Sequence, residues 1–101
     1  MEVVGLVCFT LYSCVQLNQS VSILIVEDTT PYCLREVRGC ALLNESRVIV
    51  KNDTNKKRQR ATLFHELLHI ELGPDHTKDF LKRDNDHRDY IGVIDRMELI
   101  E

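Results

Sequence analysis

The sequence reads Arg60-Ala-Thr-Leu-Phe-His-Glu-Leu-Leu-His-Ile-Glu-Leu-Gly-Pro-Asp-His76 at its most informative point. Within this stretch His65, Glu66 and His69 form the pattern H-E-x-x-H. Histidines four positions apart lie on one face of a helix, with Cβ atoms about 5–6 Å apart, so both imidazoles can bind one zinc ion. Glu66 can lean toward a water on that ion and serve as general base. The stretch therefore predicts a metal-binding helix.

The residues after this helix predict a sharp turn. Gly73-Pro74 is a stop signal, because glycine suits the left-handed position that ends a helix and proline cannot continue the hydrogen-bond ladder. A turn at this point can bring His76 back to the metal as the third ligand, and Asp75 is the competing oxygen ligand. A neutral imidazole suits a histidine-rich zinc site better, so Asp75 is expected to support a ligating imidazole by accepting its N–H.

Length and composition limit what the chain can be. A chain of 101 residues predicts one domain, residues 1–101, with 44% hydrophobic and 29% charged residues as in globular proteins. A net charge of −3 gives no general attraction to nucleic acid or to anionic membranes. The apolar run Val3–Val15 is too short to span a bilayer and lacks a basic leader, so we expect it in the core and expect no membrane partner.

The four cysteines form no C-x-x-C pair, so a cysteine zinc site or a redox dithiol is not expected. Reduced, half-buried thiols in a cytoplasmic protein, or a nuclear one in a eukaryote, are the preferred interpretation. Two disulfides in a secreted chain are the alternative. The cysteines concerned are Cys8, Cys14, Cys33 and Cys40.

Strands are predicted where β-branched and aromatic residues gather, at Val3–Val15, Val21–Glu27 and Arg47–Lys51. Polar residues predict turns at Leu17–Ser20 and Asp28–Pro31. The strand Arg47–Lys51 precedes the metal helix, and at a sheet edge it could pair with an extended peptide through its backbone. The alternative is that this strand lies in the interior of the sheet.

The segment Asn52–Asn55 offers side-chain oxygens that can cap the metal helix. Beyond the turn, Thr77–Arg83 predicts the opening of another helix and Asp84–Asp89 a charged break. Tyr90–Ile100 predicts either a continuation of that helix or a separate C-terminal helix. The segment Tyr32–Ser46 carries no clear pattern.

The segment from His65 to Phe80 resembles the active-site segment of WLM-type and SprT-like metalloproteases, in which an H-E-L-x-H helix is followed by Gly-Pro, a His next to an Asp, and a Phe. Gly39, Leu43-Asn44 and Val48–Lys51 are similar to the strand before that helix, so the resemblance covers about residues 39–83. In the family pattern the His precedes the Asp, whereas this chain has Asp75-His76, which shifts the third-ligand position by one residue.

The resemblance implies a small zincin-like α+β domain, with a short mixed sheet packed on the active-site helix and a C-terminal helix. It implies zinc ligands at His65, His69 and His76, with Glu66 as the catalytic acid/base. It also implies a protein or peptide substrate and, as in several members of the family, association with DNA-bound proteins. The chain resembles ImmA/IrrE-type domains less closely, through Thr62-Leu-Phe-His-Glu66, and that likeness implies a carboxylate such as Glu98 as third ligand.

The function expected from these features is that of a zinc-dependent metalloprotease, an endopeptidase in which Glu66 takes a proton from a metal-activated water. Tyr90 and His87 are candidates by residue type for stabilising the oxyanion.

The alternative function is that of a catalytically silent or latent zinc-binding domain that regulates or binds a partner, since a chain of this size leaves few residues to build the walls of a substrate site. A weaker third interpretation is nucleic-acid contact through the basic run Lys56–Arg60.

Overall fold

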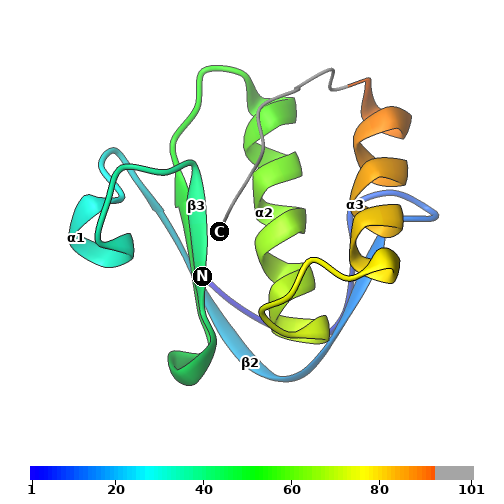
Figure 1. Ribbon diagram of the computed structural model, residues 1–101, viewed down its shortest axis with the longest axis horizontal. Helices are drawn as coiled ribbons and strands as arrows, with labels where there is room; N and C mark the ends of the chain where they lie inside the picture. Colours follow the sequence, from blue (N-terminus) through cyan, green and yellow to red (C-terminus); the bar gives the residue numbers. More distant parts are fainter. Residues whose placement is uncertain (93–101) are drawn as a thin grey trace.

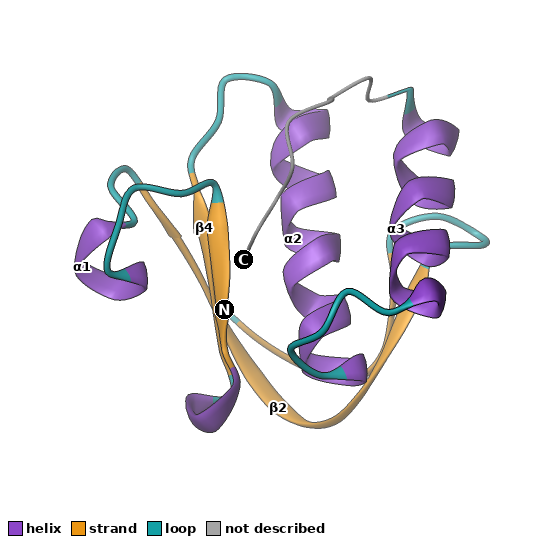
Figure 2. Cartoon of the chain, viewed as in Figure 1, coloured by secondary structure: helices purple, strands orange, loops and turns teal. Residues whose placement is uncertain are grey.

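The computed structural model of the protein describes residues 1–92. Its elements form a four-stranded mixed sheet with helices, so the predicted α+β class is confirmed (Figures 1 and 2). A short 3₁₀ turn covers Leu43–Glu45. In chain order the other elements are β1 (Glu2–Cys8), β2 (Cys14–Val26), α1 (Thr30–Cys33), β3 (Gly39–Leu42), β4 (Arg47–Lys51), α2 (Lys56–Leu72) and α3 (Lys78–Ile91).

The strands lie in the order β1-β2-β4-β3. β2 and β4 are parallel, and the other two neighbouring pairs are antiparallel. The strand predicted at Arg47–Lys51 is thus confirmed as β4, but it lies in the interior of the sheet between β2 and β3. The expectation of an edge strand at Arg47–Lys51 is therefore wrong, and β3 holds the edge position on this side of the sheet.

The core lies between the sheet and the helices. α2 packs on β2, β3 and β4, and α3 stands beside α2 (Figure 2). Alternation along β2 and β4 turns apolar side chains toward α2, while Phe80 completes the core from α3. The buried residues of this cluster are Val15, Leu17, Val21, Ile23, Val48, Val50, Phe64, Leu67, Leu68 and Phe80.

The N-terminal third differs from the prediction in two places. Val3–Val15 is not one strand, because β1 ends at Cys8 and residues 9–13 turn the chain into β2. The Thr10 hydroxyl stabilises that turn by accepting the backbone N–H of Tyr12 and of Ser13. The predicted turn Leu17–Ser20 lies inside β2, where residues 18–20 are exposed between buried apolar neighbours.

α2 forms as predicted. The Asn55 side chain caps it by accepting the backbone N–H of Arg58, and the helix ends before Gly73, whose φ of 99° is left-handed. Glycine adopts this conformation without steric cost, so the chain leaves the helix at the predicted point.

α3 confirms the helix opening predicted at Thr77–Arg83, but the charged break predicted at Asp84–Asp89 is wrong. It runs without interruption from Lys78 to Ile91, after Thr77 accepts the backbone N–H of Phe80. Its buried residues are Phe80, Asp84, His87 and Arg88, at spacings of one helical face. Asp84–Asp89 was expected to break the helix because it is charged, but half of those residues are buried on that face. Of the segment Tyr90–Ile100, the first two residues belong to α3, Gly92 caps the helix, and residues 93–100 lie outside the described residues.

The cysteines form two disulfides, Cys8–Cys14 and Cys33–Cys40, so the predicted reduced state is wrong. The hairpin places Cys8 directly opposite Cys14, and the second bridge joins the end of α1 to the edge strand β3. Pairing depends on this register, which the spacing alone does not give. Among residues 1–92, no helix has the length and apolar character needed to cross a membrane.

Candidate metal centre

Three imidazoles meet at the C-terminal end of α2. His65 and His69 project from the helix and His76 from the loop that follows it, and their ligand atoms all lie within 4.8 Å of one another. Nε2 of His69 and Nε2 of His76 are 3.1 Å apart. Two nitrogens that share a tetrahedral zinc at roughly 2.0–2.1 Å lie about 3.3 Å from each other. This group could therefore hold a metal ion with little rearrangement.

Hydrogen bonds fix the orientation of the two helix histidines. Nδ1 of His65 lies 3.1 Å from Oδ2 of Asp84, and Nδ1 of His69 lies 2.9 Å from the Gly73 carbonyl oxygen. A carboxylate and a carbonyl oxygen only accept hydrogen bonds, so Nδ1 carries the proton in each ring. Nε2 is then the nitrogen with which each ring would bind a metal.

Asp84 is a site residue that the sequence did not reveal. It comes from α3, is 5% exposed, and accepts a second hydrogen bond from Nε of Arg88 at 3.2 Å. Burial alone would raise the pKa of this carboxyl, but the hydrogen bond to His65 and the hydrogen bond and charge of Arg88 outweigh burial and lower it. Asp75, expected to support an imidazole, is exposed, and the two Nδ1 contacts are made by Asp84 and Gly73 instead.

Phe80 forms an apolar wall beside the three histidines. Its ring centroid lies 4.9 Å from that of His65, 4.5 Å from His69 and 5.0 Å from His76, and the side chain is fully buried. The resemblance named this Phe, and the sequence alone gave it no role. Packing against it restricts the three imidazoles and lowers the local dielectric, which strengthens electrostatic interactions at the site.

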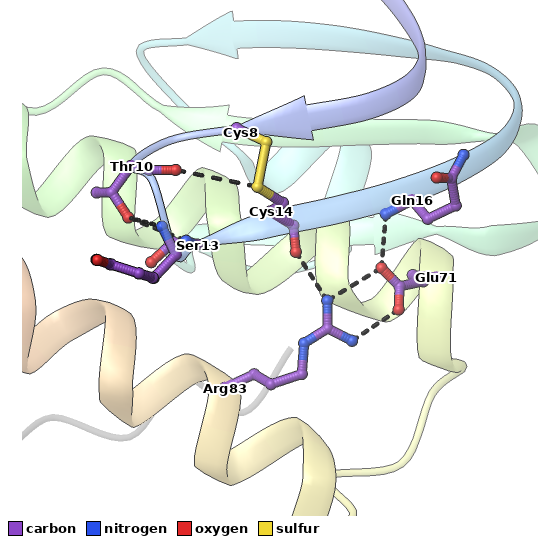
Figure 3. Close-up of a disulfide and its surroundings, with 8 residues drawn as sticks. Cys8, Thr10, Ser13, Cys14, Gln16, Glu71 and Arg83 are labelled. Carbon is purple, nitrogen blue, oxygen red and sulfur yellow. Dashed lines mark hydrogen bonds and ion pairs between the residues drawn. A yellow bond between two sulfur atoms is a disulfide. The ribbon is translucent and has the colours of Figure 1, made fainter.

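An ion-paired bracket fixes the ends of the two helices that carry the site (Figure 3). Arg83 of α3 donates to both carboxylate oxygens of Glu71 in α2, at 2.7 and 3.1 Å, and to the Cys14 carbonyl of β2 at 2.8 Å. Glu71 also accepts the backbone N–H of Gln16 at 2.6 Å. The hydrogen bonds from Arg83 lower the pKa of Glu71. The bracket thereby holds the loop that carries His76 between two anchored helix ends.

Glu66 lies between the histidines in sequence and is fully buried. It packs against the first residue of β3, since a Cβ atom added to Gly39 would lie 3.3 Å from Cγ of Glu66. The edge strand β3 is thus in direct contact with the helix segment that carries the H-E-x-x-H pattern.

The other predicted site residues lie in different places. His87 packs its ring on Phe64, with centroids 4.3 Å apart, and Tyr90 is 61% exposed beside Tyr12. Within the basic run Lys56–Arg60, Arg58 forms an ion pair with Asp53, whereas the other three basic residues are exposed at the start of α2. Glu98, the alternative third ligand, lies outside the described residues.

Comparison of the chain with models of protein families, with curated proteins and with solved structures finds no match in any of the three.

Proposed function

We propose that the protein is a zinc-dependent metallopeptidase. The observation that carries this proposal is the convergence of His65, His69 and His76, with Glu66 on the same helix. Three neutral imidazoles with a carboxylate nearby are the donor set of catalytic zinc, which keeps one coordination position for water or substrate. Zinc held there would polarise the scissile carbonyl and lower the pKa of water toward about 7.

The residues of the chain would have separate roles in hydrolysis. The three histidines hold the metal, and Asp84 and the Gly73 carbonyl keep His65 and His69 in the required tautomer. Glu66 accepts a proton from the attacking water and passes it to the leaving amine. Phe80 excludes water from the rear of the site.

The edge strand β3 would bind the substrate. It is the last strand of the sheet and contacts α2 beside Glu66, so an extended peptide could pair with its outer backbone edge and lie across the histidines. The substrate class is therefore an unfolded or extended protein segment. Proteins attached to DNA are the narrower class that the resemblance suggests.

Metal analysis and a cleavage assay test this proposal together. The purified chain should carry about one zinc per molecule, and His65→Ala or His69→Ala should remove it. Glu66→Gln keeps the shape of the side chain but cannot accept a proton, so it should retain zinc and lose cleavage of denatured casein by about 10²-fold or more. Equal zinc in wild type and both histidine variants would reject the metal site, and full turnover by Glu66→Gln would reject its role as base.

One observation favours a second function, that of a latent or regulatory zinc-binding domain. Glu66 has 0% of its surface exposed, whereas a general base must reach the attacking water. In a latent domain the wild type would bind zinc but hydrolyse no denatured protein, and Glu66→Gln would behave like the wild type in both assays.

A further inference from the structure

A cavity lies at the other end of the α2–α3 pair from the loop that carries His76. The first turns of α2 and the last turns of α3 meet at this end (Figure 1), and the cavity between them has a volume of about 300 Å³. It is lined by Phe9, Lys57, Arg60, His87, Tyr90 and Ile91. This cavity belongs to neither the histidine group nor the bracket around Arg83.

The cavity is positively charged on one side. Lys57 and Arg60 are one helical turn apart, and no ion pair or hydrogen bond of their side chains is found within residues 1–92. Their neighbours in the basic run differ, because Lys56 donates to Asn52 and Arg58 pairs with Asp53. The lining includes no carboxylate. The helix dipole places partial positive charge at the start of α2, where it disfavours cations. An anion at this position would therefore be stabilised by Lys57, by Arg60 and by the helix dipole.

His87 supplies an unsatisfied polar group in the same lining. It is 1% exposed, its ring packs against both Phe64 and Phe9, and neither ring nitrogen has a hydrogen-bond partner within the described residues. Burial, only partly offset by Asp84, lowers the pKa of His87 and keeps the ring neutral. A buried donor without a partner destabilises the folded protein, and an acceptor on a ligand would offset that cost.

We propose that this cavity binds a small organic anion, a carboxylate or phosphate group carried on an aromatic or apolar body. Lys57 and Arg60 bind the acidic group, Phe9 and Ile91 contact the apolar body, and the imidazole of His87 donates its N–H to a ligand oxygen. A volume of about 300 Å³ is at the lower end for small-molecule sites, so the ligand is close in size to one ring with one acidic group. The inference is independent of peptidase activity.

Titration of the isotope-labelled full chain, followed by amide chemical shifts, tests the proposal. Phenyl phosphate and benzoate are the two anionic probes, and they distinguish phosphate from carboxylate ligands. Inorganic phosphate lacks the ring and phenol lacks the charge, so each should bind at least about tenfold more weakly than phenyl phosphate. Shifts should concentrate on the ends of α2 and α3 and on Phe9. Shifts at the histidine group alone, or equal affinity for inorganic phosphate and phenyl phosphate, would overturn the proposal.

Exposed cations provide variants that do not threaten the fold. Lys57→Ala and Arg60→Ala should each weaken phenyl phosphate binding about threefold, and the double variant about tenfold. Lys56→Ala is the matched control and should bind as the wild type does, because that lysine is not part of the lining. Unchanged affinity in the double variant would overturn the site.

The role of His87 has its own test. His87→Phe keeps an aromatic ring against Phe64 and removes both nitrogens, so it should fold and bind phenyl phosphate about threefold more weakly. Circular dichroism establishes folding. If this variant unfolds, the Lys57 and Arg60 variants still decide the proposal. If it folds and binds as tightly as the wild type, His87 has no part in the site.

Discussion

The third member of the histidine group is the position for which the sequence left three candidates, His76, Asp75 and Glu98, of which Glu98 lies outside the described residues. Both His76 and Asp75 are exposed, but Nε2 of His76 lies 3.1 Å from Nε2 of His69, and His76 rather than Asp75 belongs to the group that could hold a metal ion. We therefore expect His76→Ala to weaken zinc binding by about 10²-fold or more and Asp75→Ala to change it by less than about threefold. Competition with a chromophoric chelator measures both affinities. The reverse order of effects would make Asp75 the ligand.

The carboxylate of Asp84 acts through His65, and its effect should appear in metal affinity. Asp84→Asn keeps an oxygen acceptor but removes the charge that stabilises the Nδ1 proton of His65, so zinc affinity should fall about 10–100-fold.

Asp86→Asn is the control for that change, since Asp86 is on the same helix and pairs with the exposed Lys82. Because Asp84 also pairs with the buried Arg88, denaturant unfolding of the metal-free variants should accompany the titration. Equal zinc affinity in the Asp84 and Asp86 variants would contradict the role of Asp84.

At the scale of elements, α2 and β4 could be predicted from the sequence, whereas only the opening of α3 could be. The signals for α2 are local, because Asn55 caps it and Gly73 ends it. The interior of α3 is rich in charged residues, and whether each can be buried depends on partners that are distant in sequence. Asp84 is buried where it meets His65, nineteen positions earlier. The same reason kept Asp84 out of the predicted site, since only the packing of α3 on α2 brings the two together.

The close contact between β3 and α2 depends on the absence of a side chain at Gly39. A Cβ atom there would lie 2.8 Å from the Ile49 carbonyl oxygen and 2.9 Å from Cγ2 of Thr62. Gly39→Ala should therefore push β3 away from α2 and destabilise the fold by about 1–3 kcal/mol in urea unfolding. Adding Thr62→Ser relieves the side-chain overlap but not the backbone one, so only part of the loss should return. Wild-type stability in Gly39→Ala would show that the strand moves without cost.

The Arg83–Glu71 bracket gives the joined helices a dependence on pH. Arg83 holds the pKa of Glu71 below its ordinary value of 4.5, so the unfolded chain binds the proton more readily. The stability that Glu71 contributes, roughly 1–3 kcal/mol, is present above about pH 4.5 and is lost as the pH falls through the lowered pKa. Glu71→Gln should therefore be less stable than the wild type at pH 6, and the difference should shrink by pH 3.

Glu45→Gln is the matched control for Glu71→Gln, because Glu45 pairs with Arg47 on the surface at 3.8 Å. Its stability should follow that of the wild type across the same pH range. A constant difference between Glu71→Gln and the wild type from pH 6 to pH 3 would contradict the lowered pKa of Glu71.

At the scale of the whole molecule, the two disulfides involve the two opposite edge strands of the sheet, β1 and β3. Cys8–Cys14 closes the β1–β2 hairpin, and Cys33–Cys40 ties the α1 segment to the edge strand β3. The sequence showed an even number of cysteines without a pairing pattern, so the choice between thiols and disulfides depended on the compartment. Two disulfides are typical of oxidising compartments. The cytoplasmic or nuclear localisation stays a prediction.

Reduction should separate the contributions of the two bridges. Each closes a short loop, with separations of 6 and 7 residues, for which the chain-entropy estimate is about 2 kcal/mol. Urea unfolding with and without a phosphine reductant should show a loss of about 4 kcal/mol for the wild type, and about half of that for the Cys8→Ser/Cys14→Ser variant, which keeps one bridge. Thiol titration of the unreduced protein in denaturant should detect no free thiol.

Removal of one bridge at a time should affect different parts of the molecule. Cys33–Cys40 anchors β3, which contacts α2 at Glu66, whereas Cys8–Cys14 lies beside the bracket that holds α2 and α3 (Figure 3). Loss of the Cys33–Cys40 bridge in Cys33→Ser/Cys40→Ser should therefore raise hydrogen exchange in β3. Zinc affinity should stay within about threefold of the wild type, because the histidine group depends on α2 and α3. A large loss of zinc affinity in this variant would mean that β3 helps to position the metal group.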